Sequence, residues 1–130
     1  MLNHASILVV EDEPFIALDL ALAVEDAGGE VVGPVGSVKE ALALIATTSI
    51  AAAILDVNLV DGDCSPLVEV LAGLNVQIIL QSGVGPTAAM SQRYPNLVVQ
   101  IKPCMAARLV AQLGALIAQQ KAAVPGVTLN

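Results

Sequence analysis

Five polar side chains stand at or just after the ends of short apolar runs, although the sequence spreads them over about ninety positions. Three are carboxylates, one is a hydroxyl and one is an ammonium group. Crowded carboxylates repel one another unless a cation compensates them, and Mg²⁺ suits oxygen ligands together with a phosphoryl group. These residue types therefore fit a site that binds Mg²⁺ and handles phosphate. They are Glu11, Asp12, Asp56, Ser82 and Lys102.

Each of these residues has an assignable role in phosphoryl chemistry. Asp56 is a candidate nucleophile, because a carboxylate oxygen can attack phosphorus. Lys102 can pair with the phosphoryl charge, and Ser82 can donate a hydrogen bond to a phosphoryl oxygen. Taken singly, an acidic pair suits a solvated helix start and a serine or lysine suits a loop. Their common position after strands favours the site.

Five apolar runs alternate with five segments of helical character. This alternation predicts an α/β fold, a doubly wound parallel sheet of five strands with five helices. The carboxyl ends of parallel strands meet at one edge, so the five polar residues should meet there too. We expect strands at residues 7–10, from 31, 52–56, 76–80 and 97–101, and helices at 14–27, 38–47, 66–73, before 94 and at 105–120.

Local signals fix several predicted boundaries. Pro14 suits the first turn of a helix, and the Ser37–Glu40 spacing is that of a capping box. Residues 57–64 are expected to form a loop. Ser65 is expected to cap the third helix, with Pro66 at its first helical position. Residues 82–86 are expected to form a flexible loop.

The composition excludes several classes of protein. The chain has 130 residues, 56% of them apolar and 13% charged, which fits one folded domain. Its formal net charge of −7 argues against a nucleic-acid surface. No cysteine pattern indicates a disulfide framework or a zinc site, and no run suits a signal peptide or a membrane span. We expect a cytoplasmic protein whose core is built from Ala, Val, Leu and Ile.

The motifs together resemble the receiver domain of two-component response regulators, over the chain to about residue 120. The resemblance rests on residues 7–13, 54–62, 80–83 and 101–103, read as ILVVEDE, ILDVNLVDG, LQSG and IKP. It implies a flavodoxin-like sheet of order 2-1-3-4-5. It also implies a receiver domain at residues 1–121 and a flexible tail at residues 122–130.

The resemblance also implies roles for individual residues. Asp56 is expected to be the phosphorylation site. Asp12 should bind Mg²⁺ directly and Glu11 through a metal-bound water, with the backbone carbonyl of Asn58 completing the protein ligands. A cis peptide bond should precede Pro103 and aim Lys102 into the site.

Three residues are expected to take part in switching: Ser82, Gly83 and Gln100. Most receivers carry an aromatic ring where this chain has Gln100. We expect Gln100 to share a face of its strand with Lys102 and to keep its rotamer, while residues 82–94 rearrange.

A finer resemblance, to the alphaproteobacterial receivers called FAT GUY, rests on residues 80–85 and 100–103. Those receivers have Phe-Ala-Thr-Gly where this chain has Leu80-Gln81-Ser82-Gly83, and Phe where it has Cys104.

The resemblance implies a stand-alone phosphoacceptor that signals through other proteins and is not an enzyme. Its donor would be a sensor histidine kinase or a histidine phosphotransfer protein. A homodimer or a docking surface near the fourth and fifth helices is expected. One alternative is a haloacid-dehalogenase-type phosphatase, although Asn58 stands where that class needs a second Asp. Another is a pseudo-receiver that binds without phosphorylation. The sequence leaves open the cognate kinase, the output partner and the phosphoryl lifetime.

Overall fold

The computed structural model describes residues 2–83 and 88–123. In these residues one parallel sheet of five strands has the order β2-β1-β3-β6-β7. Counted along the chain without the two short strands β4 and β5, this is the predicted order 2-1-3-4-5. The strands of the sheet are β1 (Ser6–Val10), β2 (Glu30–Val35), β3 (Ala52–Asp56), β6 (Gln77–Ser82) and β7 (Val98–Ile101).

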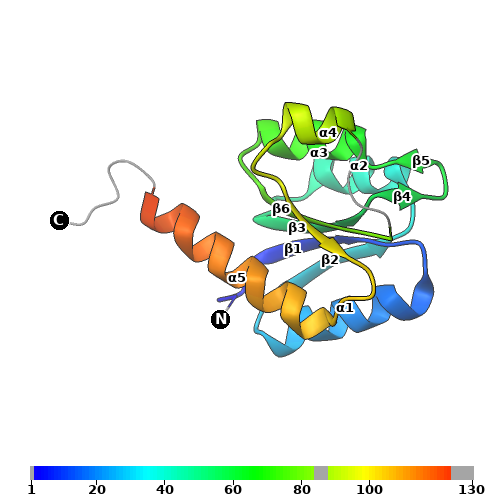
Figure 1. Ribbon diagram of the computed structural model, residues 1–130. Coiled ribbons are helices and arrows are strands. Elements are labelled where there is room, and N and C mark those ends of the chain that lie inside the picture. Colours follow the sequence, from blue (N-terminus) through cyan, green and yellow to red (C-terminus); the bar gives the residue numbers. More distant parts are fainter. Residues whose placement is uncertain (1, 84–87, 124–130) are drawn as a thin grey trace.

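Five helices of the described residues cover both faces of this sheet, as predicted. Figure 1 shows α1 and α5 on one face and α2, α3 and α4 on the other. Such a three-layer arrangement is the doubly wound α/β fold. The helices are α1 (Pro14–Asp26), α2 (Val38–Thr47), α3 (Ser65–Gly73), α4 (Ala88–Arg93) and α5 (Ala106–Ala123).

Strand alternation divides the core into two apolar layers. In β3, Ile54 packs in the layer beneath α1 and α5, whereas Leu55 packs in the layer beneath α2, α3 and α4. Both side chains are completely buried, as are the other residues of β1 and β3 except Ser6 and Asp56. Central strands that are buried on both faces explain why these runs are continuously apolar.

The expected starts of the first two helices are confirmed. Pro14 opens α1, where the carboxylate of Glu13 accepts a hydrogen bond from the backbone N–H of Phe15 at 2.9 Å. Ser37 caps α2 by accepting a hydrogen bond from the backbone N–H of Glu40 at 3.1 Å. After α1 the chain turns at Gly28, whose φ of +85° favours glycine.

Two expectations for residues 57–65 are wrong. This stretch is not a plain loop, because β4 (Asn58–Leu59) and β5 (Gly62–Asp63) pair as a small antiparallel hairpin. Cys64 stands at the cap position of α3, so Ser65 is not the cap but the first helical residue, and Pro66 is the second helical residue and not the first. The carboxylate of Asp63 accepts the hydrogen bond of the Ser65 backbone N–H at 2.8 Å, so the acid two residues earlier takes over the capping contact.

The end of the domain differs slightly from the expected one. α5 continues to Ala123, so residues 122 and 123 belong to the helix and not to the expected tail. Residues 124–130 of that tail and residues 84–87 of the expected loop lie outside the described residues. No helix in residues 2–83 or 88–123 has the length and apolar character that crossing a membrane requires.

Candidate phosphoacceptor site

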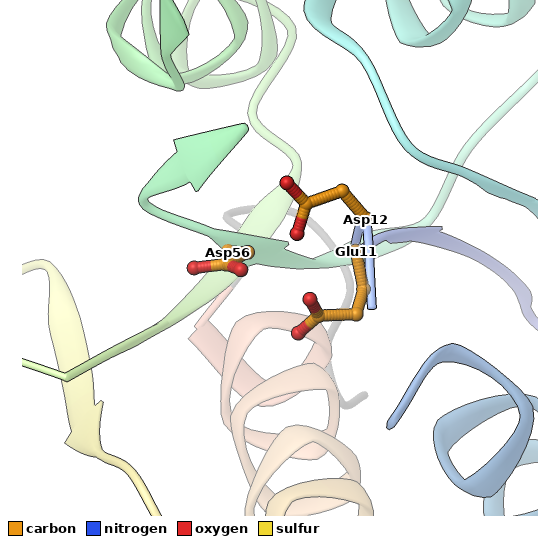
Figure 2. A group of neighbouring side chains, drawn as sticks. All are labelled: Glu11, Asp12 and Asp56. Carbon is orange, nitrogen blue, oxygen red and sulfur yellow. The ribbon is translucent and has the colours of Figure 1, made fainter. Parts of the chain in front are cut away.

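Three carboxylates meet at the carboxyl edge of the sheet, as predicted. Asp56 ends β3, and Glu11 and Asp12 directly follow β1, its hydrogen-bonded neighbour. One carboxylate oxygen from each residue lies within 4.8 Å of the others. Figure 2 shows the carboxyl groups of Glu11 and Asp12 on one side of a shared space and that of Asp56 on the other. Strand pairing therefore brings together side chains that are far apart in the sequence.

Lys102 joins this cluster from the segment after β7. Its Nζ donates to Asp56 Oδ2 at 3.0 Å and to Glu11 Oε1 at 3.1 Å. Burial alone would lower the pKa of Lys102, but its hydrogen bonds and charge interactions with Asp56 and Glu11 together raise that pKa. The lysine is therefore held as a cation beside the carboxylate expected to react. The Lys102–Pro103 peptide bond is cis, as the resemblance implies.

Glu11 is the most enclosed member of the cluster, with a side chain that is 0% exposed. Its pKa is raised, mainly because burial disfavours the charged carboxylate. Hydrogen bonds from the Glu13 backbone N–H, at 3.0 Å, and from Lys102 work in the opposite direction. A buried carboxylate of this kind needs compensating charge.

The donor set fits a hard divalent cation such as Mg²⁺. Glu11, Asp12 and Asp56 offer only carboxylate oxygens, the ligand type that Mg²⁺ prefers. Asp12 is exposed while the other two are buried, so one side of the cluster is open to water. Because Mg²⁺ keeps several waters when it binds proteins, an open side suits it.

The other predicted site residues lie around this cluster. Ser82 is the last residue of β6 and is completely buried, and its backbone carbonyl accepts the N–H of Lys102 at 2.8 Å. Gly83 follows it. Asn58 begins β4, and its backbone N–H donates to Asp56 Oδ1 at 3.4 Å. The metal contact of the Asn58 carbonyl stays a prediction.

Gln100 lies on the face of β7 that is covered by α5. Its Nε2 donates to Gln112 Oε1 at 2.6 Å. This placement agrees with the alternation that puts Gln100 and Lys102 on one face of the strand. Gln100 is thus hydrogen-bonded to a helix beside it, which the sequence alone does not reveal.

Two residues of the site region were not among the sequence-based candidates. Gln81 is 2% exposed, and its Nε2 donates to Glu11 Oε1 at 2.9 Å. An amide inside the apolar run of β6 was the available signal. Asp61, at the tip of the hairpin, accepts the backbone N–H groups of Val38 and Lys39 at 2.7 and 3.1 Å, which lowers its pKa. It fastens the hairpin to the start of α2.

Both cysteines lie in the described residues as free thiols. Cys64 is buried, and burial together with the nearby charge of Asp63 raises its pKa to about 12. A thiol of that pKa is not a nucleophile at neutral pH. Cys104 is also free and lies two residues after Lys102.

Solved structures give the comparison with known proteins. The solution structure of SdrG from Sphingomonas melonis is 34% identical, with a TM-score of 0.74, and the alignment covers 91% of this chain and 99% of that one. The BeF3-activated conformation of SdrG, described as from Pseudomonas melonis, is 36% identical, with a TM-score of 0.68 and coverages of 90% and 99%. A CheY-like receiver domain from Methanospirillum hungatei is 22% identical, with a TM-score of 0.80 and coverages of 90% and 96%.

No protein-family model matches the sequence, and no curated protein matches it. The solved structures nevertheless agree with the fold. The chain belongs to the response-regulator receiver domains of two-component signalling.

Proposed function

We propose that Asp56 accepts a phosphoryl group from a phosphohistidine donor in a Mg²⁺-dependent reaction. The observation that carries this proposal is the contact of the Lys102 ammonium with Asp56 Oδ2 at 3.0 Å, beside the carboxylates of Glu11 and Asp12. The relative SdrG, at least 34% identical, adopts a BeF3-activated conformation, which supports activation of this chain by a phosphoryl group.

The residues divide the reaction among them. A carboxylate oxygen of Asp56 forms a bond to phosphorus while the bond from phosphorus to the donor histidine nitrogen breaks. The imidazole leaves with the electron pair of that bond and takes up a proton. Lys102 moves with the developing charge onto a phosphoryl oxygen, and Ser82 donates to another. Bound Mg²⁺ would neutralise the phosphoryl oxygens, with Asp12 and Asp56 as its direct ligands, Glu11 acting through a water and the Asn58 carbonyl as a further ligand.

The donor is a sensor histidine kinase or a histidine phosphotransfer protein, and the output is a contact with another protein. Exposed apolar side chains suit such contacts. In the described residues, Phe15, Leu18 and Leu22 form an exposed apolar stripe on α1, and Ile101 and Met105 are exposed on β7 and before α5. A homodimer through α4 and α5, a cytoplasmic location, a non-enzymatic role and membership of the FAT GUY receivers stay predictions.

Switching is proposed to run through the segment after β6. The hydrogen bond of Gln100 to Gln112 gives Gln100 a partner that it would lose by turning inward. Gly83 lacks a Cβ and so gives the backbone next to Ser82 conformational freedom, and the pull of a phosphoryl group on Ser82 can be passed on to α4. Of the residues 82–94 expected to rearrange, residues 84–87 lie outside the described residues. Amide chemical shifts of the free and the beryllofluoride-bound protein test this. A large change for the Gln100 side chain with a static α4 would contradict it.

The central test is incorporation of one phosphoryl group, followed by intact mass. With acetyl phosphate or a phosphohistidine donor and Mg²⁺, the wild-type mass should rise by one phosphoryl group. Asp56→Asn should take none, and EDTA should stop the reaction in the wild type. Asp63→Asn, which alters an acid of the nearby hairpin, is the matched control and should be phosphorylated. Incorporation into Asp56→Asn at the wild-type rate would refute the assignment.

A further inference from the structure

A buried amide, Gln81, contacts the acidic cluster from β6. Gln81 is 2% exposed and belongs to the set of largest fully buried side chains of the described residues. Its Nε2 donates to Glu11 Oε1 at 2.9 Å, across seventy positions of sequence. Burying an amide in an apolar strand costs free energy unless it is hydrogen-bonded, so its position needs an explanation.

Alternation along β6 explains which way Gln81 points. Ile79 packs in the layer beneath α1 and α5, and Gln81 follows it two residues later on the same face. There it lines a cavity of about 300 Å³ together with Lys102 and the apolar side chains of Ile16 and Leu20. Gln81 and Lys102 therefore approach Glu11 from the same side.

In the described residues Glu11 accepts hydrogen bonds from three donors. Oε2 accepts from the backbone N–H of Glu13, and Oε1 accepts from both Gln81 and Lys102. Of the three donors Lys102 carries the charge, and its Nζ also contacts Asp56 Oδ2 at 3.0 Å. When Lys102 turns toward a phosphoryl group on Asp56, Glu11 keeps two of these three protein donors, and both are neutral.

We propose that Gln81 is a positioning residue of the phosphoacceptor site, because its amide holds Glu11 Oε1 in place and keeps that buried carboxylate hydrogen-bonded while Lys102 moves to the phosphoryl group. The role rests on the proposed phosphorylation of Asp56. Without the amide, Glu11 depends on Lys102 for its remaining side-chain hydrogen bond. The lysine is then held back from the phosphoryl group, and phosphorylation slows.

The first experiment replaces the amide by an apolar side chain of similar length. Gln81→Met should take a phosphoryl group from acetyl phosphate about tenfold more slowly than the wild type, the scale of one hydrogen bond to a charged group. Gln77→Met is the matched control, the same change on the same face of β6 but at the amino-terminal end of the strand. It should stay within about twofold of the wild type. A Gln81→Met rate equal to that of Gln77→Met would overturn the proposal.

The second experiment asks whether Gln81 acts through Glu11. Gln81→Met is made in the wild type and in Glu11→Ala, and the urea midpoint of unfolding is measured for all four proteins. Gln81→Met should lower the midpoint in the wild type but not in Glu11→Ala, because the amide then has no Glu11 carboxylate to which it could donate a hydrogen bond. An equal fall in both backgrounds means simple packing and overturns the proposal. Gln81→Ala replaces Gln81→Met if the latter does not fold.

The two experiments separate failure of this proposal from failure of the proposed function. If the wild type takes no phosphoryl group, the proposed function fails, and the unfolding measurements alone decide whether Gln81 holds Glu11. If the wild type is phosphorylated and Gln81→Met is equally fast, only the role of Gln81 fails.

Discussion

The ion pairs at the two edges of the sheet differ in how far they are buried. At the carboxyl edge, Lys102 pairs with Glu11 and Asp56 while the three side chains are 24%, 0% and 8% exposed. Toward the amino edge, the pair of Arg93 and Glu69 spans 3.8 Å with side chains that are 63% and 62% exposed. The ion pairs are thus buried at one edge and solvated toward the other.

This difference indicates which edge of the sheet carries the functional site. An exposed ion pair contributes little to stability because water and salt screen it, so its presence does not indicate a function. A buried pair loses hydration that its mutual attraction barely offsets, and apolar residues would often serve stability as well. Charges kept under these conditions at the carboxyl edge are therefore best explained by a function that needs them.

The largest expected effect comes from removing the cation of the buried cluster. Lys102→Met should lower the free energy of unfolding by about 2 kcal/mol in the absence of divalent cations, because Glu11 and Asp56 are left buried without a positive partner. Lys121→Met, at an exposed position of α5, is the control and should stay within about 0.5 kcal/mol of the wild type. Urea denaturation measures both. Equal stability of the two variants would remove the contrast between the edges.

A smaller effect is expected from metal binding. Mg²⁺ at ten times its Kd should stabilise the wild type by about 1.4 kcal/mol, the amount that mass action gives for binding to the folded state alone. Asp12→Ala should lose this stabilisation, because it removes the exposed ligand of the cluster. Asp26→Ala, an exposed acid at the end of α1, should retain it. Thermal unfolding at several Mg²⁺ concentrations decides, and an unchanged Mg²⁺ response in Asp12→Ala would argue against a metal site here.

The smallest effect is expected toward the amino edge. A double-mutant cycle of Glu69→Ala and Arg93→Ala should give a coupling energy below about 0.5 kcal/mol, since both side chains are exposed. The coupling should shrink further in high salt. A coupling above about 1 kcal/mol would mean that exposure does not distinguish the two edges.

The sequence predicts which residues meet in the site but not the hydrogen bonds between them, and the reason is physical. Asp56 and Lys102 end up together because parallel strands align their carboxyl ends, a property of topology that apolar runs reveal. The hydrogen bond from Gln81 to Glu11 depends on side-chain depth and rotamer, which periodicity does not specify. The hairpin at residues 58–63 was missed because its strands have two residues each, too short for any alternation to register.

Tyr94 can serve as an intrinsic fluorescent probe of this protein. The chain has one tyrosine and no tryptophan, so Tyr94 supplies essentially all of its intrinsic ultraviolet fluorescence. The ring packs against the core beneath α3 and α4, and the guanidinium carbon of Arg93 lies 5.5 Å from its centroid. Its emission therefore reports from the point where α4 meets β7, within the segment proposed to rearrange. The proposed rearrangement can therefore be followed in real time by tyrosine fluorescence without an added label, with Tyr94→Phe as the control.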